Sequence, residues 1–273
     1  MRKRMRGIAL AAVLILEAGS VVGVNAEASG PAAAAPAAPA GGFTYNGDTG
    51  PGFWADLDPA NALCGSGTSQ SPINISHVRI DPRLRRLKLA LAATPISLVN
   101  NGHAIEEEIE SPNTLTLNGV VYTSAQFHFH TLSEHTIGGR RGAMELHAVF
   151  AGPAGRTAVV GMLFTVGHEN AFLDELTSAG LPRHTGDHVT SEAEINLADG
   201  LTDTAEYYMY SGSLTTPPCT QGVTWFVLKG EAQMSSAQFQ AFQDILGNDF
   251  RPLRSVNVRV VSATAKGGRG HGH

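Results

Sequence analysis

Basic residues are few in this chain of 273 residues, which has 19 Lys and Arg against 24 Asp and Glu. Four of the basic residues and Glu17 lie in an N-terminal leader, so the rest of the chain holds 15 basic and 23 acidic residues, a net charge of −8. Nucleic-acid binding depends on neutralising phosphates. An acidic chain without a basic patch is therefore a poor candidate for it.

The chain also lacks an apolar run of the about 20 residues that a membrane-spanning helix needs. Its longest candidate, residues 8–16, is short, ends at Glu17 and follows the basic residues of the first six positions. Small residues then continue to Ala26. This order predicts a secretory signal peptide over residues 1–26, cleaved after Ala26, and no membrane span in the mature protein. We therefore expect a periplasmic or secreted protein.

Two further terminal segments lack the periodicity of folded structure. Residues 27–42 are rich in Ala, Pro and Gly, and residues 263–273 form a polar, glycine-rich end. We expect the first to be a disordered linker and the second a flexible tail. Residues 43–262 remain for one folded domain, a size that a single hydrophobic core can support.

Cysteine is scarce, with only Cys64 and Cys219 in the whole chain. An even count in an exported protein favours one disulfide. Two buried thiols are the alternative.

The body of the chain reads as mostly β. Short β-branched or alternating segments bounded by Gly, Pro or Asn predict strands over residues 96–99, 105–109, 114–117, 120–123, 158–166, 223–228 and 256–262. The best helical patterns are residues 171–179 and 236–246, the second with a possible cap at Ser235 or Ser236. Helices are thus few, short and peripheral, and no internal repeat is visible.

Three histidines are the most informative residues. Residues 126–130 alternate polar and aromatic side chains, so a strand would place His128 and His130 on one face. Residues 144–149 alternate again after a glycine-rich turn and would bring His147 to the same face. Three neutral imidazoles with one position left open are the ligand set of a catalytic zinc site.

Candidate partners stand beside these histidines. Gln126 is two residues from His128, and Glu145 is two residues from His147, each on the same strand face as its histidine. A histidine bound to a metal needs its second ring nitrogen held by a hydrogen-bond partner. We expect Gln126 and Glu145 to fill this role.

From about residue 43 to residue 262 the chain resembles the α-class carbonic anhydrases of exported bacterial type. The segments that carry the resemblance follow the family's order: Gly50-Pro51 with Trp54, residues 70–75 (QSPINI), 100–103 (NNGH), 126–130 (QFHFH), 133–136 (SEHT), 145–147 (ELH) and 213–219 (SLTTPPC). The resemblance implies a large, twisted, mainly antiparallel sheet and a disulfide between Cys64 and Cys219. It also implies reversible hydration of carbon dioxide to bicarbonate and a proton by hydroxide on a Zn2+ ion held by the three histidines.

The resemblance assigns roles to other residues. It implies that Thr215 accepts a hydrogen bond from the hydroxide and passes its own proton to Glu134, and that His103 carries protons to buffer. The carbon dioxide pocket would be lined by Val149, Val159, Leu214 and Trp225, which could also be plain core residues, with Thr216 beside them. Sulfonamides and anions are expected as inhibitors. The oligomeric state stays open, with a homodimer among the options.

The chain departs from the family at three places. Phe43 stands where the family usually has Trp, which should matter little, and Glu106 occupies a cleft position commonly held by an amide. The segment after Pro252 lacks the usual Gln-Pro, so the carbonyl that should orient His130 is not placed. We expect His135 to serve structure, and His77, His168, His184 and His188 to lie on the surface or in loops.

Two other interpretations compete. A cupin would share the pattern of His128, His130 and Glu134, but its second motif fails because Ala158 stands where a histidine is required. A catalytically inactive, zinc-binding relative of the carbonic anhydrases is the other. The retention of all three candidate ligands, with Glu134 and Thr215, argues against it.

Overall fold

The computed structural model describes residues 42–109 and 113–265. The predicted signal peptide, nearly all of the predicted linker and the end of the predicted tail lie outside these residues. Within the described ranges, none of the helices has the length and apolar character that crossing a bilayer requires.

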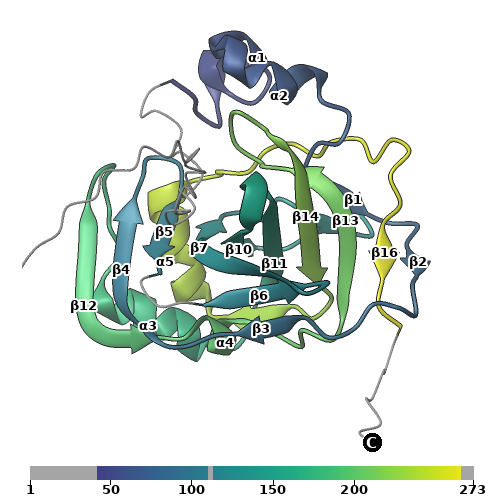
Figure 1. The fold of residues 1–273 in the computed structure, drawn as a ribbon. Helices are drawn as coiled ribbons and strands as arrows, with labels where there is room; N and C mark the ends of the chain where they lie inside the picture. Colours follow the sequence, from purple (N-terminus) through teal and green to yellow (C-terminus); the bar gives the residue numbers. More distant parts are fainter. Residues whose placement is uncertain (1–41, 110–112, 266–273) are drawn as a thin grey trace, which may run out of the picture. The chain divides into compact units, whose positions relative to one another are not determined.

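One sheet of 13 strands organises the described part of the chain (Figure 1). Its main path runs in the order β12-β4-β5-β7-β10-β11-β14-β13-β16-β2. The strands are β2 (Arg79–Ile80), β3 (Lys88–Ala90), β4 (Thr94–Asn100), β5 (Ile105–Glu108), β6 (Thr114–Leu117), β7 (Val120–His130), β10 (Met144–Ala151), β11 (Thr157–Val166), β12 (His188–Ile195), β13 (Tyr207–Ser213), β14 (Gln221–Leu228), β15 (Ala232–Met234) and β16 (Ser262–Ala263). Most neighbours are antiparallel, while β14 and β15 pair with β11, and β2 with β16, in parallel. The predicted mostly β class is confirmed.

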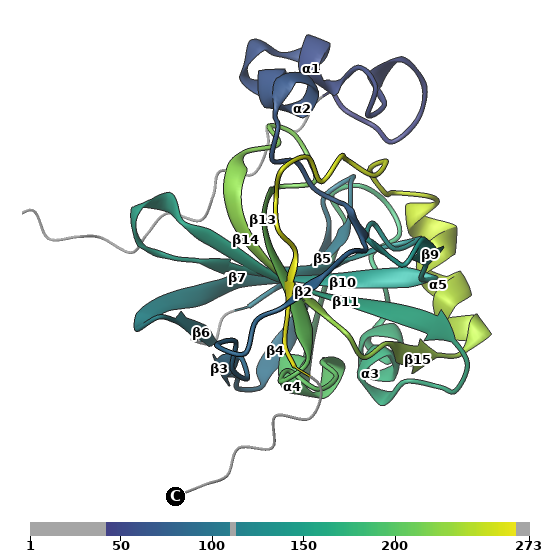
Figure 2. The same cartoon turned by 90° about the vertical axis from the view of Figure 1, so that its right-hand side faces the viewer.

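The remaining elements are short. A second sheet joins β1 (Asn74–Ile75), β8 (Thr136–Ile137) and β9 (Arg140–Arg141). The helices are α1 (Trp54–Leu57), α2 (Ala62–Ser66), α3 (Ala171–Ala179), α4 (Leu197–Gly200) and α5 (Ser236–Leu246), with three 3-10 turns at Gly47–Thr49, Pro59–Asn61 and Pro153–Gly155. Figure 2 shows how the strands fan out as the sheet twists, which follows from the right-handed twist of each strand.

Both predicted helices form with the predicted bounds. Ser235, one of the two candidate caps, begins α5: its hydroxyl accepts from Gln238 N–H, and the Gln238 side chain accepts from Ser235 N–H. This reciprocal pair satisfies two of the amides that a helix start leaves open. The apolar residues of α3 and α5, including Leu173 and Phe242, pack into the main core.

The predicted strand over residues 256–262 is wrong over most of its length, because only Ser262 is in a strand. Asn257 has a φ of +53°, and Arg259 N–H donates to the carbonyl of Val256, so the chain turns here. The side chain of Val258 is 98% exposed. The β-branched residues therefore lie in an irregular loop that is exposed at Val258 and Val260 and buried at Val261.

Strand β10 lies near the middle of the main sheet and is covered on both faces. Leu146, Ala148 and Phe150 point into the larger apolar cluster, where Phe127 and Phe129 of β7 join them. The alternate residues Glu145 and His147 point to the opposite face and are also buried. The core on one face thus fixes the backbone that carries the polar residues on the other.

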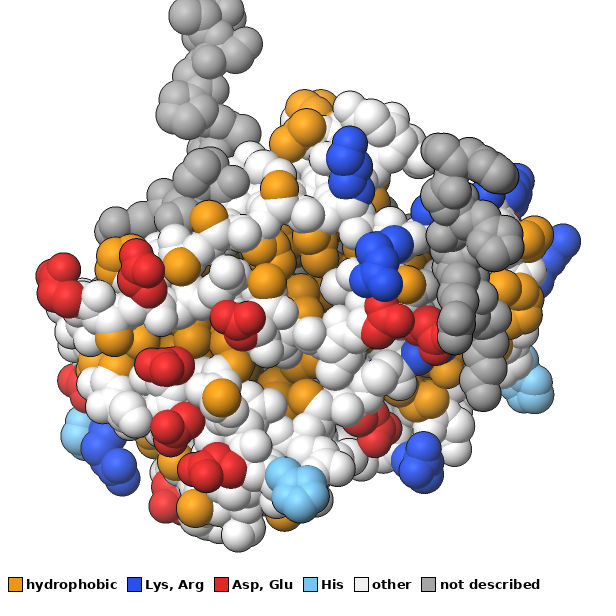
Figure 3. Space-filling view, turned by 90° about the horizontal axis from the view of Figure 1, so that it is seen from below, with side chains coloured by type: hydrophobic (Ala, Val, Ile, Leu, Met, Phe, Trp, Pro, Cys, Tyr) orange, Lys and Arg blue, Asp and Glu red, His pale blue; other side chains and the backbone are white. Residues whose placement is uncertain are grey.

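Figure 3 shows one face of the molecule, on which acidic and basic side chains are interspersed. The described part of this face carries no continuous basic patch.

A disulfide joins Cys64 in α2 to Cys219, across 155 residues of sequence, as the resemblance implied. Both cysteines are buried in a small cluster with Phe43 and Trp54. The bond ties the α1–α2 segment to the loop that carries Thr215.

We expect the double substitution Cys64→Ala and Cys219→Ala to lower the free energy of unfolding by about 2–5 kcal/mol, because the unfolded chain gains the entropy of an open loop. Urea unfolding followed by fluorescence measures this change. Wild-type protein unfolded with a thiol reductant is the control and should approach the stability of the variant. Identical midpoints for the oxidised wild type and the variant would contradict the expectation.

Candidate metal centre

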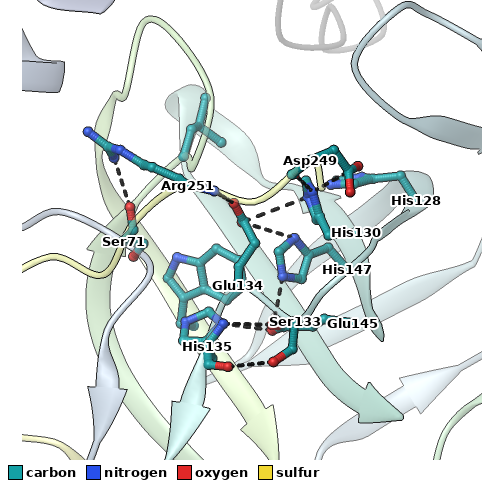
Figure 4. Close-up of polar contacts among 12 residues, drawn as sticks. Ser71, His128, His130, Ser133, Glu134, His135, Glu145, His147, Asp249 and Arg251 are labelled. Atoms are coloured by element: carbon teal, nitrogen blue, oxygen red, sulfur yellow. Dashed lines mark hydrogen bonds and ion pairs between the residues drawn. The ribbon is translucent and has the colours of Figure 1, made fainter. Parts of the chain in front are cut away.

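The three predicted histidines converge on one face of the sheet (Figure 4). The antiparallel register of β7 and β10 sets His147 opposite His128, and Glu145 opposite His130. One ring nitrogen of each histidine lies within 4.8 Å of the corresponding nitrogens of the other two. His130 and His147 are buried, and His128 is half-buried. The period-two alternation of both strands thus produces the cluster that the sequence predicted.

Each ring is held from behind by a different acceptor. His128 Nδ1 lies 2.8 Å from Gln126 Oε1, and His130 Nδ1 lies 2.8 Å from the backbone carbonyl of Asp249. His147 Nε2 lies 3.0 Å from Glu145 Oε1, although the contact is not aligned as a regular hydrogen bond. These acceptors require protonated nitrogens, so the inward nitrogens are Nε2 of His128, Nε2 of His130 and Nδ1 of His147.

The inward nitrogens suit a metal cation. His130 Nε2 is buried without a hydrogen-bond partner among the described residues, and its nearest carboxylate oxygen, Glu134 Oε2 at 3.7 Å, is equally unpartnered. Buried polar atoms are rarely left in this state. A divalent cation bound to the three nitrogens would satisfy His130 Nε2 and place positive charge near Glu134 Oε2, and four-coordinate zinc with three histidines leaves one position for a reactant. The donor set therefore fits zinc.

The charges around the histidines also favour a cation. Burial, together with the neighbouring rings of His130 and His147, holds the pKa of His128 well below its usual value. Burial likewise lowers the pKa of His147. Burial also acts against a charge on His130, but Glu134 and Asp249 outweigh it and raise the pKa of His130 to about 10. The negative charge of Glu134 and Asp249, which favours a proton on His130, would also favour a metal cation bound to that ring.

Glu145 connects the cluster to a buried hydrogen-bond chain. Its two oxygens accept from the backbone N–H of His135 at 2.8 Å and meet His135 Nδ1 at 2.7 Å. His135 Nε2 lies 2.7 Å from the hydroxyl of Tyr210, which lies 2.7 Å from Ser71 Oγ. Burial raises the pKa of Glu145, but the adjacent His135 and His147 outweigh burial and hold that pKa well below its usual value. His135 thus has the structural role that we expected.

Glu134 is held by the C-terminal segment. Its Oε1 accepts from the backbone N–H of Arg251 at 2.8 Å. The guanidinium of Arg251 is buried and donates to Gln70 Oε1 and to the carbonyls of Ser71 and Cys64. The residues that support Glu134 therefore come from both ends of the described chain.

Three contributors to the site, Asp249, Arg251 and Tyr210, were missed by the sequence analysis. The carbonyl that could not be placed belongs to Asp249, 119 residues after His130. No local pattern marks it, because any residue supplies a backbone carbonyl. The Tyr210 hydroxyl reaches His135 from β13, a strand that the sequence pattern did not predict.

The candidate pocket residues lie beside the cluster. Val149, Val159, Leu214 and Trp225 all belong to the second apolar cluster, on the face of the sheet that bears the histidines. The ring centroids of Trp225 and His147 are 4.8 Å apart. Thr215 is buried and Thr216 half-buried in the loop after β13. Within the described ranges no hydrogen bond joins Thr215 to Glu134.

His103 lies in the turn between β4 and β5. The Asn101 side chain accepts from its backbone N–H at 2.9 Å, and its ring stacks on Phe43 with centroids 3.7 Å apart. Burial lowers the pKa of His103. The ring, Tyr45 and Asp249 also line the same cavity, whose volume is about 510 Å³. Phe43, the first departure from the family pattern, is thus in direct contact with the candidate shuttle.

The other histidines lie where they were expected. His77, His168, His184 and His188 are all exposed.

The arrangement is that of a three-histidine metal site, and the comparisons specify the family. Residues 49–265 match the family model of the eukaryotic-type carbonic anhydrases. A carbonic anhydrase of Klebsiella pneumoniae is 37% identical over 222 residues, covering 80% of this chain and 89% of the relative.

Two solved structures agree. The α-carbonic anhydrase of Photobacterium profundum has a TM-score of 0.76 at 38% identity, covering 81% of this chain and 99% of its own. That of Thermovibrio ammonificans, solved with the inhibitor sulfanilamide, has a TM-score of 0.78 at 35% identity, covering 81% and 98%. The chain belongs to the eukaryotic-type, or α, carbonic anhydrases, the zinc-dependent enzymes that hydrate carbon dioxide.

The substitution Tyr210→Phe removes one hydroxyl from the buried chain and leaves His135 Nε2 without its partner. We expect it to lower the free energy of unfolding by about 1–3 kcal/mol, the cost of one buried unsatisfied group. Urea unfolding of the protein measures this. The control Tyr208→Phe makes the same change at a half-buried ring two residues along β13, and a loss as large there would contradict the role of the Tyr210 hydroxyl.

Proposed function

We propose that His128, His130 and His147 hold the catalytic zinc of this enzyme. The observation that carries the proposal is that all three rings point one nitrogen at a common point while an acceptor holds the other. In carbonic anhydrases a zinc ion on three histidines lowers the pKa of its water ligand to about 7. Zinc bound here would therefore supply a nucleophile for carbon dioxide at neutral pH.

Thr215 and Glu134 orient that nucleophile in the proposal. Glu134 Oε1 is already occupied by the backbone N–H of Arg251, and Oε2 is free to accept. The Thr215 hydroxyl would donate a hydrogen bond to Oε2, so its own oxygen could only accept from the nucleophile. The nucleophile then points a lone pair at the substrate, and ligands without a hydrogen to donate are disfavoured.

The substrate side of the site is apolar. Carbon dioxide has no charge and no net dipole, so it gains little from polar neighbours. We assign its pocket to Val149, Val159, Leu214 and Trp225, which share one apolar cluster next to His147, with Thr216 at the polar edge of the cleft. Sulfonamides and anions would inhibit by taking the place of the nucleophile, and a relative solved with the inhibitor sulfanilamide supports the inclusion of sulfonamides.

His103 is the proposed proton carrier. Its ring is half-buried on the loop beside the cluster, and its lowered pKa keeps it neutral, and able to accept a proton, at pH 7. After it accepts, the ring passes the proton to buffer.

We also propose that the protein is exported. Residues 1–26 form the leader, residues 27–42 the linker, residues 43–262 the catalytic domain and residues 263–273 the tail. The disulfide suits an oxidising compartment, and supports a periplasmic or secreted enzyme.

We expect His147→Ala to abolish stoichiometric zinc binding and carbon dioxide hydration, because two imidazoles do not make a zinc site of this class. Zinc content by atomic emission and hydration by stopped flow measure the two effects, and circular dichroism verifies the fold. His168→Ala, at an exposed histidine, is the matched control. A folded His147→Ala protein with one tightly held zinc would refute the ligand assignment, whereas wild-type protein with zinc but no hydration would favour an inactive zinc-binding relative.

For His103→Ala we expect hydration in weak buffer to slow by about 100-fold, the low end for loss of a proton-transfer group, because proton export loses its carrier. Ester hydrolysis, which turns over more slowly, should be largely intact. Stopped-flow rates at rising imidazole concentration provide the check, since free imidazole should restore hydration. Equal loss of both activities, with no rescue by imidazole, is the contrary result.

A further inference from the structure

Glu106, the second departure from the family pattern, lies on the metal face of the sheet. It belongs to β5, where Ile105 and Glu107 are buried and Glu106 is half-buried. The antiparallel register of β5 and β7 sets Glu106 opposite His128 and Glu108 opposite Gln126. Its side chain therefore shares a face with the candidate ligand His128 and with the partner of that ligand.

The carboxylate of Glu106 contacts the side chain that holds His128. Gln126 Nε2 donates to Glu106 Oε2 at 3.0 Å, while Gln126 Oε1 meets His128 Nδ1 at 2.8 Å. Asn101, from the turn that carries His103, donates to the same Glu106 oxygen at 3.4 Å. One carboxylate oxygen thus joins the turn of the candidate shuttle to a candidate zinc ligand.

An amide can face a histidine in two ways, and only one suits metal binding. If Oε1 of Gln126 faces His128, Nδ1 carries the proton and Nε2 offers its lone pair inward. If the amide is turned over, its NH2 donates to Nδ1, and the ring proton moves to Nε2, where it blocks a cation. An ionised carboxylate only accepts hydrogen bonds, so Glu106 can pair with the NH2 group of Gln126 but repels its carbonyl oxygen.

We propose that Glu106 is a positioning residue that locks the Gln126 amide in the orientation that makes His128 a zinc ligand. It acts through Gln126 and does not touch the metal. The amide usual at this position in the family can both donate and accept, so it would pair with Gln126 in either orientation. The ionised carboxylate of Glu106 pairs only with the orientation in which Gln126 Oε1 faces His128. The inference rests on the proposed function, because it takes His128 as a ligand.

The test compares Glu106→Gln with the control Glu108→Gln, which removes the same charge two residues along β5. Glu108 is exposed, and its carboxylate accepts from Ser97 Oγ. Each substitution is made alone and also in a Gln126→Ala background. Work at about pH 8.5 keeps Glu106 ionised, since burial and the neighbouring Glu108 raise its pKa to about 7.

Two readouts are independent of turnover. The first is the rate of zinc release into excess chelator, and the second is the nitrogen NMR shifts of the His128 ring in zinc-free protein, which report the tautomer. We expect Glu106→Gln to speed zinc release by about tenfold, the low end for loss of an outer partner, and to add the Nε2–H tautomer. Glu108→Gln should leave both unchanged, and Glu106→Gln should change release by less than about twofold in the Gln126→Ala background.

Three results would overturn the inference. These are wild-type zinc release and tautomer in Glu106→Gln, an equal effect of Glu108→Gln, and a full effect of Glu106→Gln when Gln126 is absent. Failure of the proposed function looks different, because the wild-type protein would then bind no zinc, or would bind it with no change in the His128 ring signals.

Discussion

The site depends on polar contacts made on the outer side of each imidazole. Buried rings lose their hydration, and each needs one nitrogen satisfied by the protein while the other stays available. In this chain an amide oxygen, a backbone carbonyl and a carboxylate do this for His128, His130 and His147. All three are acceptors at these contacts, so all three fix the ring proton on the outer side. The inward nitrogens are thereby directed to a common point, where a metal ion would displace the proton that Glu134 and Asp249 favour on His130.

The apolar core on the opposite face of the sheet fixes the positions of the three histidines. Strands β7 and β10 alternate, so the residues between the histidines are large apolar side chains such as Phe127, Phe129 and Leu146. These are fully or almost fully buried and close-packed, which leaves the strand backbones little freedom. A core substitution that shifts either strand would therefore move a candidate ligand without touching it.

Charge is balanced by the same contacts. Glu134 and Glu145 are both fully buried, and a buried carboxylate is costly unless a cation or donors compensate it. Glu145 has His135 and His147 beside it, and Glu134 has the Arg251 amide at one oxygen only. A divalent cation on the three histidines would place positive charge near both. The buried negative charge of Glu134 and Glu145 therefore accounts both for the hydrogen bonds around them and for the preference of the site for a cation.

Local pattern was sufficient to bring the three candidate ligands together and to predict part of the fold. Period-two alternation put His128, His130 and His147 on one face, helix patterns gave α3 and α5, and the order of short motifs identified the family. It failed where a residue's role depends on distant backbone. The strand predicted over residues 256–262 is a loop around Asn257, and the partner of His130 is a carbonyl 119 residues away. The face that each side chain takes could be predicted from neighbouring residues, because alternation is a property of the local sequence. The carbonyl, amide or hydroxyl that completes each contact could not, because those groups meet only when distant segments of the chain pack together.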